Sequence, residues 1–246
     1  MRCESVNSLN QYLLLVEQVS STHFCDENRH RTKQDGEMLF RGQSDDYPLL
    51  PKIARTDDQF DLLKREFHML SELKRRGSIY RNLGRLDVWD LLTLAQHYGM
   101  ATRLLDWSRN PLTAIWFACK DGAVDNEAFV YILLPHWDIG LLDRTLVAAP
   151  EKHNGISILR PNLEDPRVVA QDGWFTVHSV SRKHGRFVPL GESEHHAEGM
   201  VKVMIQPGSK QKILESLDIL GVSHQTVFPD LEGICAYLNW TSKKIG

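Results

Sequence analysis

The sequence lacks the features that mark several large classes of protein. No stretch of its 246 residues approaches the roughly 20 consecutive apolar residues that span a bilayer, and the N-terminus has no apolar signal-peptide core. Neither G-x-G-x-x-G nor G-x-x-x-x-G-K-[ST] occurs, which argues against a Rossmann or P-loop nucleotide site. We therefore expect a cytoplasmic protein without a membrane partner.

Cysteine is scarce and basic charge is not in excess. The four cysteines are scattered without C-x-x-C spacing, so we expect reduced thiols and no metal. The formal net charge is −3, which provides no global field for nucleic acid or anionic membranes, although a local basic pocket is compatible with it. With 42% hydrophobic and 25% charged residues, the composition is that of an ordinary globular protein.

Hydrophobic periodicity predicts more helix in the first half of the chain and strands mixed in later. The predicted helices cover 8–20, 57–76, 87–98, 210–220 and 228–240, with another that begins at Asn110-Pro111. The predicted strands cover 38–42, 128–134, 173–178 and 200–205, while 21–37 and 182–198 are predicted loops and 101–107 is an irregular or extended link. This pattern predicts one α+β domain over 1–246, in which 1–37 form an N-terminal helix and loop and 38–240 form the core.

The first polar site begins at Phe40-Arg41-Gly42-Gln43. Arg41 directly follows three apolar residues, so it is expected at a strand end near the core. A guanidinium group stays charged when it is desolvated and offers a planar fork of donors, which suits phosphate or carboxylate recognition. Gly42 would let a ligand or another backbone approach closely. The alternative is a structural arginine paired with a core carboxylate such as Asp106.

The second polar site is the segment Gln96 to Asp121, QHYGMATRLLDWSRNPLTAIWFACKD. Leu104 and Leu105 are expected to bury the link before the helix, and Asp106 is expected to be buried with them. Free N–H groups at the following helix start favour anions. A concentration of polar and aromatic groups around one helix entry argues for a site, although Asp106 and Ser108 could instead only brace that entry.

Three other features are weaker. Gln171 precedes an aromatic strand whose Phe175 is a candidate to stack on a planar ligand. Asp230 and Glu232 lie at a predicted helix start, where carboxylates usually favour the dipole, so a capping role is preferred for them. A Ser-His-Asp hydrolase is disfavoured because no G-x-S-x-G elbow surrounds Ser108 and its candidate partners lie within twelve positions.

At this point the chain resembles the FRG domain family, named for its Phe-Arg-Gly signature. The resemblance rests on four blocks: FRGQ at Phe40–Gln43, QHYGMATRLLDWSRNPLTAIWFA at Gln96–Ala118, AQDGWFTVH at Ala170–His178 and TVFPDLEGICAYL at Thr226–Leu238. The departures are mild, since Met100-Ala101, Ser108 and Glu232 stand where other residues are common in the family. The family's activity has been unknown, so this resemblance alone does not define a function.

The chain also has a distant similarity to arginine-type ADP-ribosyltransferases. These enzymes carry an aromatic-Arg-Gly block on the first core strand, a Ser/Thr-containing strand end that feeds a helix, and a carboxylate late in the chain. Arg41 matches the first element, and Asp106–Ser108 followed by Asn110–Ala118 resembles the second. No E-x-E or Q-x-E matches the third, for which Gln171, Asp230 and Glu232 are the candidates.

This similarity implies an ADP-ribosyltransferase-like β core and an enzyme that consumes NAD, of the toxin, effector or anti-phage defence type. It would cleave the nicotinamide–ribose bond and modify an unknown protein or nucleic-acid acceptor. The implied catalytic residues are Arg41, His97, Ser108 and Glu232. The implied NAD contacts are Arg41, Gly42, Gln43, Tyr98, Arg103, Asp106, Trp107, Asn110, Gln171 and Phe175. A non-catalytic module for a nucleotide or phosphate ligand and a hydrolase of another class are the alternatives.

Overall fold

A computed structural model describes residues 1–24, 37–55, 61–123, 125–134, 139–162, 165–192 and 194–242. In chain order the strands are β1 (Arg2–Val6), β2 (Leu39–Gln43), β3 (Leu104–Ser108), β4 (Ala128–Leu133), β5 (Ile156–Leu159), β6 (Gly173–His178) and β7 (Met200–Ile205). The α-helices are α1 (Leu9–Phe24), α2 (Leu62–Gly77), α3 (Val88–His97), α4 (Pro111–Cys119), α5 (Pro166–Ala170), α6 (Glu194–Glu198), α7 (Lys210–Ile219), α8 (His224–Val227) and α9 (Leu231–Ser242). Short 3-10 turns cover Lys52–Ala54, Leu83–Arg85 and Pro150–Lys152.

The strands form one seven-stranded mixed sheet in the order β1-β7-β4-β2-β3-β6-β5. β1 runs parallel to β7, whereas each other pair of neighbouring named strands is antiparallel. The predicted α+β class is therefore confirmed. None of the helices in the described ranges is both long and apolar enough to cross a membrane.

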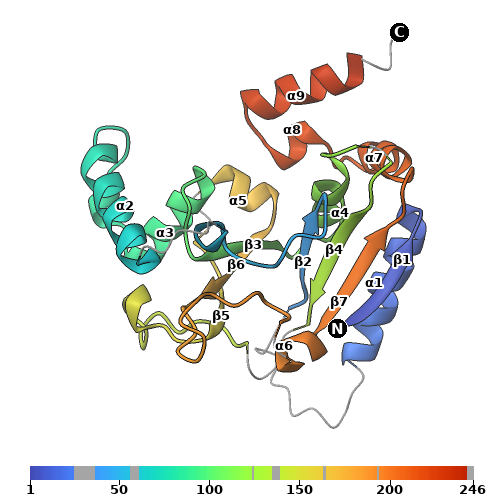
Figure 1. The fold of residues 1–246 in the computed structure, drawn as a ribbon. Coiled ribbons are helices and arrows are strands. Elements are labelled where there is room, and N and C mark those ends of the chain that lie inside the picture. The colour runs from blue at the N-terminus through green and yellow to red at the C-terminus, as the bar shows by residue number, and fades with distance from the viewer. Residues whose placement is uncertain are drawn as a thin grey trace.

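The sheet is covered differently on its two faces. Along β4, Ala128, Val130 and Ile132 pack into a core with α1, α4 and α7. Its alternate residues, among them Phe129 and Tyr131, pack into a second core on the opposite face. Burial of both faces explains why this strand is a continuous apolar run in the sequence. A third core joins α2 and α3 to β3, β5 and β6 at the other end of the molecule (Figure 1).

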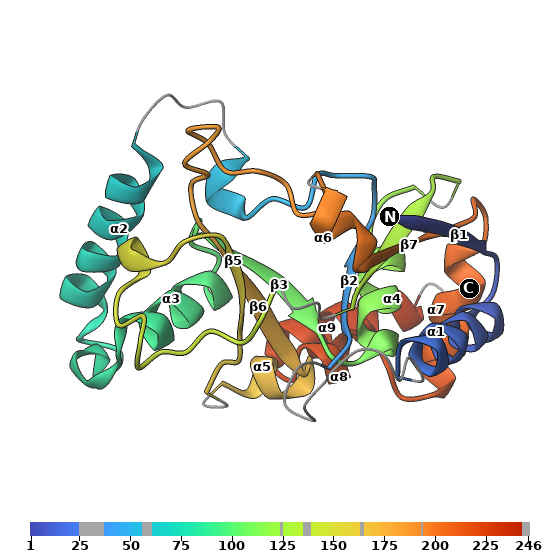
Figure 2. The same ribbon diagram turned by 90° about the horizontal axis from the view of Figure 1, so that it is seen from below.

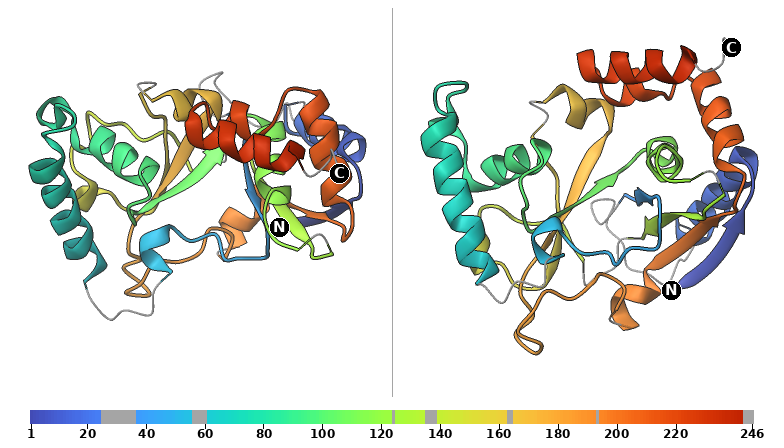
Figure 3. Two further views of the ribbon diagram at one scale, coloured as in Figure 1. Left: turned by 90° about the horizontal axis from the view of Figure 1, so that it is seen from above. Right: turned by 45° about the horizontal axis from the view of Figure 1, so that its top comes forward.

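The sheet splits between the neighbouring strands β2 and β3. β2 and β3 share a single pair of opposed residues, Phe40 and Ser108. Beyond that pair the strands diverge, so that β3 runs across the direction of β2 and β4 (Figure 1). Seen from below, α2, α3, β3, β5 and β6 lie on one side of the split, and α1, α4, α7, β1, β2, β4 and β7 lie on the other (Figure 2). The short helix α8 and the longer α9 lie beyond the sheet, between α5 and α7 (Figure 3).

The start of α4 shows how the sequence fixes one wall of this split. Asn110 caps the helix by accepting a hydrogen bond from the Leu112 N–H, and Pro111 occupies its first turn, as predicted. Leu104 and Leu105, also as predicted, are buried. Because both α3 and α4 are anchored on apolar residues, the polar residues between them are held at fixed positions.

Several predicted boundaries are wrong. The first helix does not end at residue 20 but continues to Phe24, and within it the hydroxyls of Ser21 and Thr22 bond back to the carbonyls of Glu17 and Gln18. The rest of the predicted loop up to 36 lies outside the described residues, as does the predicted helix start at 57–60. The described helix α2 begins after Asp61, whose carboxylate caps it.

Four further segments differ from their predictions. The N-terminal segment is more than a helix and loop, since β1 joins the sheet as an edge strand beside β7. The link at 101–107 contains β3, whose pairing with β6 is a long-range contact that its own sequence does not reveal. The predicted loop 182–198 includes α6, and α9 starts at Leu231 rather than 228.

Candidate functional site

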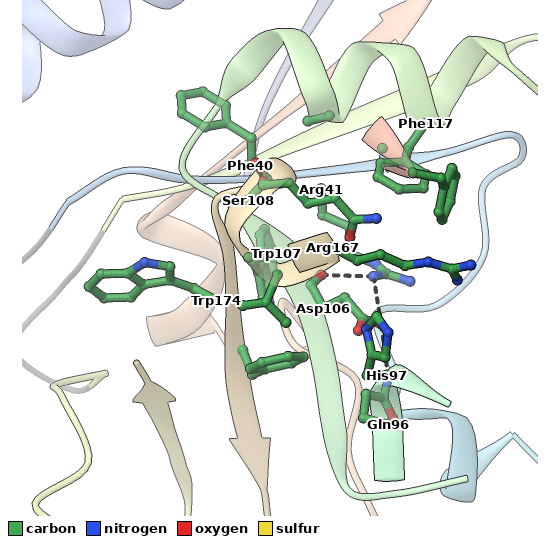
Figure 4. Close-up of a pocket in the computed structure, with 17 residues that line it drawn as sticks. Phe40, Arg41, Gln96, His97, Asp106, Trp107, Ser108, Phe117, Arg167 and Trp174 are labelled. Carbon is green, nitrogen blue, oxygen red and sulfur yellow. Dashed lines mark hydrogen bonds and ion pairs between the residues drawn. The ribbon is translucent and has the colours of Figure 1, made fainter. Parts of the chain in front are cut away.

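A cleft of about 320 Å³ opens where β2 and β3 diverge. It lies at the lower end of the size range of small-molecule sites. Its walls come from β2, β3, β6, α3, α4 and α5, together with Phe228 after α8 (Figure 4). The lining residues are Phe40, Arg41, Gly42, Gln96, His97, Asp106, Trp107, Ser108, Ala114, Phe117, Arg167, Val168, Gln171, Gly173, Trp174, Phe175 and Phe228. The segments 40–42 and 96–108 are thus brought together, as the sequence suggested.

Arg41 bridges the two diverging strands. Its Nη1 donates to the backbone carbonyl oxygen of Asp106 at 2.7 Å, and its Nε donates to Oε1 of Gln43 at 3.1 Å. Gln43 is itself fixed by donating to the Tyr47 carbonyl. Within the described part of the chain, Nη2 of Arg41 has no hydrogen-bond partner. The guanidinium is therefore oriented by neutral partners and keeps donors for a ligand.

The Arg41 side chain is 14% exposed, and burial lowers its pKa to about 10, although the Asp106 carboxylate opposes this shift. The group therefore stays charged at neutral pH. A desolvated cation without full compensation gains more from binding an anion than a solvated one does.

Gly42 lets β2 pass directly over α4. A Cβ atom at this position would lie 1.8 Å from the backbone oxygen of Ala114, which is sterically impossible. The close approach expected from the sequence is therefore one between two backbones. It holds the start of α4 against the strand that carries Arg41.

Asp106 was expected to be buried, and this prediction is wrong. Its side chain is 55% exposed and lines the cleft, with Oδ2 3.7 Å from Nη1 of Arg41. Leu105 and Trp107 on either side of it face the opposite core, so the alternation of β3 turns Asp106 toward the gap between α3 and α4.

The Asp106 carboxylate is positioned by a short chain of hydrogen bonds. Oδ2 accepts from Nε2 of Gln96 at 2.9 Å, and Oε1 of Gln96 accepts from the hydroxyl of Thr102 at 2.7 Å. In the described part of the chain, Oδ1 has no hydrogen-bond partner. The structure therefore presents a fixed carboxylate with one oxygen available, beside a charged arginine.

His97 lines the cleft at the C-terminal end of α3. Its Nε2 lies 3.3 Å from Oδ1 of Asp165, which also caps α5. Burial lowers the pKa of His97, and the charge of Asp165 only partly opposes this effect. The imidazole is therefore mostly neutral at pH 7 and is oriented by a carboxylate.

Ser108 also lines the cleft, but its hydrogen bonds are directed into the protein. Its hydroxyl donates to the carbonyl of Gln171 at 2.6 Å and accepts the Asn110 N–H at 2.9 Å. These bonds fix the start of α4 to the turn before β6. They do not join Ser108 to His97, so the geometry gives no support to a Ser-His hydrolase.

Arg167 on α5 is a cleft residue that the sequence analysis missed. Its Nε donates to Asp230 at 2.5 Å, its Nη2 donates to Glu232 at 2.9 Å, and its guanidinium lies 5.1 Å from the ring centroid of Phe228. No motif surrounds Arg167 in the sequence. The acidic residues at 230 and 232 gave no signal for it, because their position at a helix start already accounts for them.

Asp230 and Glu232 are held away from the cleft interior by these contacts. Asp230 accepts the Gly233 N–H at 3.0 Å and so caps α9, as the preferred interpretation predicted. The Glu232 side chain is 81% exposed and is not among the lining residues. The hydrogen bond and charge of Arg167 hold the pKa of Asp230 below its ordinary value.

The other predicted site residues lie behind or outside the cleft. Gln43 and Asn110 support Arg41 and α4 from behind. Tyr98 is largely exposed and packs edge-on against His97. Arg103 is buried elsewhere, where it donates to Glu66 at 2.6 Å and to the Pro150 carbonyl at 2.7 Å.

Aromatic rings form much of the remaining lining. Phe175 contributes from β6, and Phe117 and Phe228 contribute from the α4 side, whereas the rings of Trp107 and Trp174 belong to the core on the opposite face of the sheet. Figure 4 shows Arg41, Arg167, Asp106 and His97 converging from different elements into this setting. Rings around two arginines and one carboxylate suit a ligand that combines planar groups with negative charge.

One comparison with known proteins gives a match. Residues 36–127 match the family model described as the FRG domain. The matched segment contains β2, β3 and α4, and therefore the FRGQ block and the Gln96–Ala118 block, while α5 and β6 lie outside it. No curated protein and no solved structure matches the chain.

Proposed function

We propose that this FRG domain protein binds NAD in the cleft between β2 and β3 and cleaves its nicotinamide–ribose bond. The observation that carries the proposal is the pairing of a desolvated arginine with a carboxylate that faces the same cleft. Arg41 supplies an anion anchor, and Asp106 supplies a negative charge 3.7 Å from it. The distant similarity to ADP-ribosyltransferases supports this choice of ligand.

The diphosphate of NAD is assigned to the two arginines. Arg41 has an Nη2 group without a partner in the described part of the chain, and Arg167 enters the cleft from α5. Guanidinium forks bind phosphate oxygens bidentately. The phosphates would partly replace Asp230 and Glu232 as the hydrogen-bond partners of Arg167. This exchange requires α9 to move away or the Arg167 side chain to rotate.

The reacting half of NAD is assigned to the inner part of the cleft. At about 320 Å³ the cavity is small, so we expect the nicotinamide and its ribose to be enclosed and the adenosine to lie toward the rim. Phe175, which is paired with Asp106 on the neighbouring strand and lines the cleft, offers a ring for stacking the nicotinamide.

Asp106 takes the role of the catalytic carboxylate. Departure of nicotinamide leaves an oxocarbenium-like ribose, whose positive charge a nearby carboxylate stabilises. The glycosidic C–N bond breaks with its electron pair on nicotinamide, and an acceptor oxygen or nitrogen bonds to the ribose carbon. The acceptor proton leaves to a base, for which the neutral His97 is the candidate, held by Asp165. Ser108 acts as a positioning residue, because its hydroxyl is bonded to Gln171.

A second candidate is a non-catalytic module that binds a nucleotide or phosphate ligand. It is favoured by one observation, namely that the late carboxylates Asp230 and Glu232 are bound to Arg167 rather than placed opposite Arg41. Binding of NAD without release of nicotinamide would support this candidate.

Calorimetric titration with NAD tests the binding part of the proposal. Arg41→Gln and Arg167→Gln should each weaken binding by about 10- to 150-fold, the equivalent of one charge-assisted hydrogen bond. Arg41→Lys should lose less affinity for NAD, since lysine keeps the positive charge but not the planar pair of N–H donors. Arg186→Gln, in an exposed ion pair with Glu192, is the matched control and should bind like wild type. Absence of NAD binding to the folded wild-type protein would refute the proposal, as would unchanged affinity in both cleft variants.

A further inference from the structure

A basic segment at the edge of the molecule is not used by the cleft. Residues 74–85, KRRGSIYRNLGR, hold five cations and no acidic residue, in a chain whose net charge is −3. These cations, all of them exposed, are Lys74, Arg75, Arg76, Arg81 and Arg85. They cover the end of α2 and its connection to α3, which lie side by side at the end of the molecule away from α7 (Figure 1).

Part of this charge is left for a partner. Glu72 binds Arg75 and Arg76 with its two oxygens and compensates one of those two charges. Arg81 also has a partner in the structure. All five residues nevertheless remain exposed, and Lys74 and Arg85 have no ion-pair partner in the part of the chain that the structure describes.

The same segment exposes an aromatic and an aliphatic side chain between its cations. Tyr80 is 87% exposed and Ile79 is 80% exposed. Neither contributes to the apolar cores, although Leu83, a few residues further on, is buried and fixes the connection. An exposed ring among cations on an irregular backbone is the arrangement by which proteins stack bases and contact phosphates.

A shallow groove leads from this segment to the cleft. Arg81 and Leu86 line one end of it, His97 lines the other, and Asp90 and Leu94 on the same side of α3 lie between. His97 and Val168 also line the cleft, so the two depressions are adjacent. The groove has a volume of only about 30 Å³, so a polymer would lie along it rather than enter it.

The acidic residues of this groove are already paired. Asp90 accepts from Arg144 at 2.8 Å and from Asn162 at 3.0 Å. Asp165 caps α5 and contacts His97. Asp165 keeps its negative charge beside the neutral imidazole, so the positive charge lies at the outer end of the groove.

We propose that residues 74–85 bind single-stranded nucleic acid and deliver it along α3 to the cleft. If the proposed NAD chemistry holds, this strand is the acceptor. A nitrogen or oxygen atom of the nucleotide that reaches the cleft loses its proton to His97 and bonds to the ribose carbon as nicotinamide leaves. A single strand is favoured over a duplex because the exposed Tyr80 can stack only on an unpaired base. A membrane is less favoured, because two exposed apolar side chains give little insertion and the groove requires a linear ligand.

The test measures fluorescence anisotropy of labelled dT20 and U20 oligonucleotides without NAD, so that its outcome is independent of catalysis. Wild type should bind either oligonucleotide, with an affinity that falls as salt rises. Tyr80→Ala should lower the affinity for the oligonucleotide by about 5- to 150-fold, which corresponds to the stacking energy of one base. Lys74→Ala/Arg85→Ala should weaken binding and reduce the slope of log affinity against log salt by about 1.4, or roughly 0.7 per phosphate contact.

Arg182→Ala/Lys183→Ala removes two exposed cations from a distant loop and is the matched control. It should keep wild-type binding, and melting temperatures of all variants should be equal because the changed residues are exposed. The proposal is overturned if wild type binds neither oligonucleotide, if the control loses as much as the test variant, or if only phosphatidylserine vesicles are bound. A protein that binds the oligonucleotides but not NAD would refute the NAD proposal alone.

Discussion

The four residues of the FRGQ block have four different physical roles. Phe40 packs into the core with α4, Arg41 enters the cleft, Gly42 allows β2 to cross α4, and Gln43 orients the arginine. The sequence predicted a close approach at Gly42 and a ligand-binding or a structural role for Arg41. The role of Gln43 was not predictable, because it depends on the contact with the carbonyl of Tyr47.

Arg103 shows where residue-level prediction failed. An arginine beside the cleft segment looked like an NAD contact, but its partner Glu66 lies on α2, 37 positions earlier in the chain. Both side chains are buried, and burial raises the pKa of Glu66 even though Arg103 opposes this. Desolvation therefore outweighs the attraction, so the pair adds little net stability, but removal of one member would leave the other buried and unpaired.

Breaking this ion pair should destabilise the protein strongly. Arg103→Met leaves Glu66 buried and unpaired, which should lower the free energy of unfolding by about 3–5 kcal/mol in urea denaturation. Adding Glu66→Gln should recover most of the loss, since the amide oxygen can still accept the residue 103 N–H, which now bonds to Glu66 at 2.7 Å. A single Arg103→Met variant as stable as wild type would contradict this account.

At the scale of elements, the strength of local signals decided which predictions were confirmed. The start of α4 was predicted correctly because a cap, a proline and an apolar face agree within a few residues. β3 was not predicted as a strand, and consequently Asp106 was assumed to be buried along with its leucine neighbours. Once β3 is a strand, alternation turns Asp106 outward.

The β5–β6 side of the sheet carries two buried histidines that make stability depend on pH. Burial lowers the pKa of His178 to about 3 and, together with the charge of Arg103, lowers that of His153 to about 4. Unfolded histidines titrate near 6.5, so below that pH the unfolded chain takes up protons that the folded chain does not. Their contribution is complete above pH 6.5 and is lost as the pH falls toward 4.

The expected loss is about 1.4 kcal/mol per pH unit for each histidine between pH 6 and pH 4.5. Urea denaturation across this range should show a smaller slope for His178→Gln, whose amide can replace the hydrogen bond between Nε2 and Thr176. His184→Gln, at an exposed position, should leave the slope unchanged. Equal slopes for wild type and His178→Gln would rule out this assignment.

At the scale of the whole molecule, the cleft is a consequence of the split sheet. The matched segment 36–127 supplies Arg41, His97 and Asp106, but the opposite wall comes from Arg167, β6 and Phe228. Sequence blocks could predict that the four segments matter, but not which side chains meet. Asp106 and Arg167 lie far apart in the chain, so only the tertiary structure shows that their side chains line the same cleft. We expected Glu232 to be the catalytic carboxylate, and we now propose Asp106 in its place.

The most direct test of this account is nicotinamide release from NAD by wild type and Asp106→Asn, with water and with a single-stranded oligonucleotide as acceptors. Asparagine keeps the shape and an oxygen that can accept from Gln96, so NAD affinity should be unchanged. The rate should fall by about 10²- to 10³-fold, because the ribose charge loses its electrostatic partner. An unchanged rate in Asp106→Asn, or no release by wild type with either acceptor, would contradict the account.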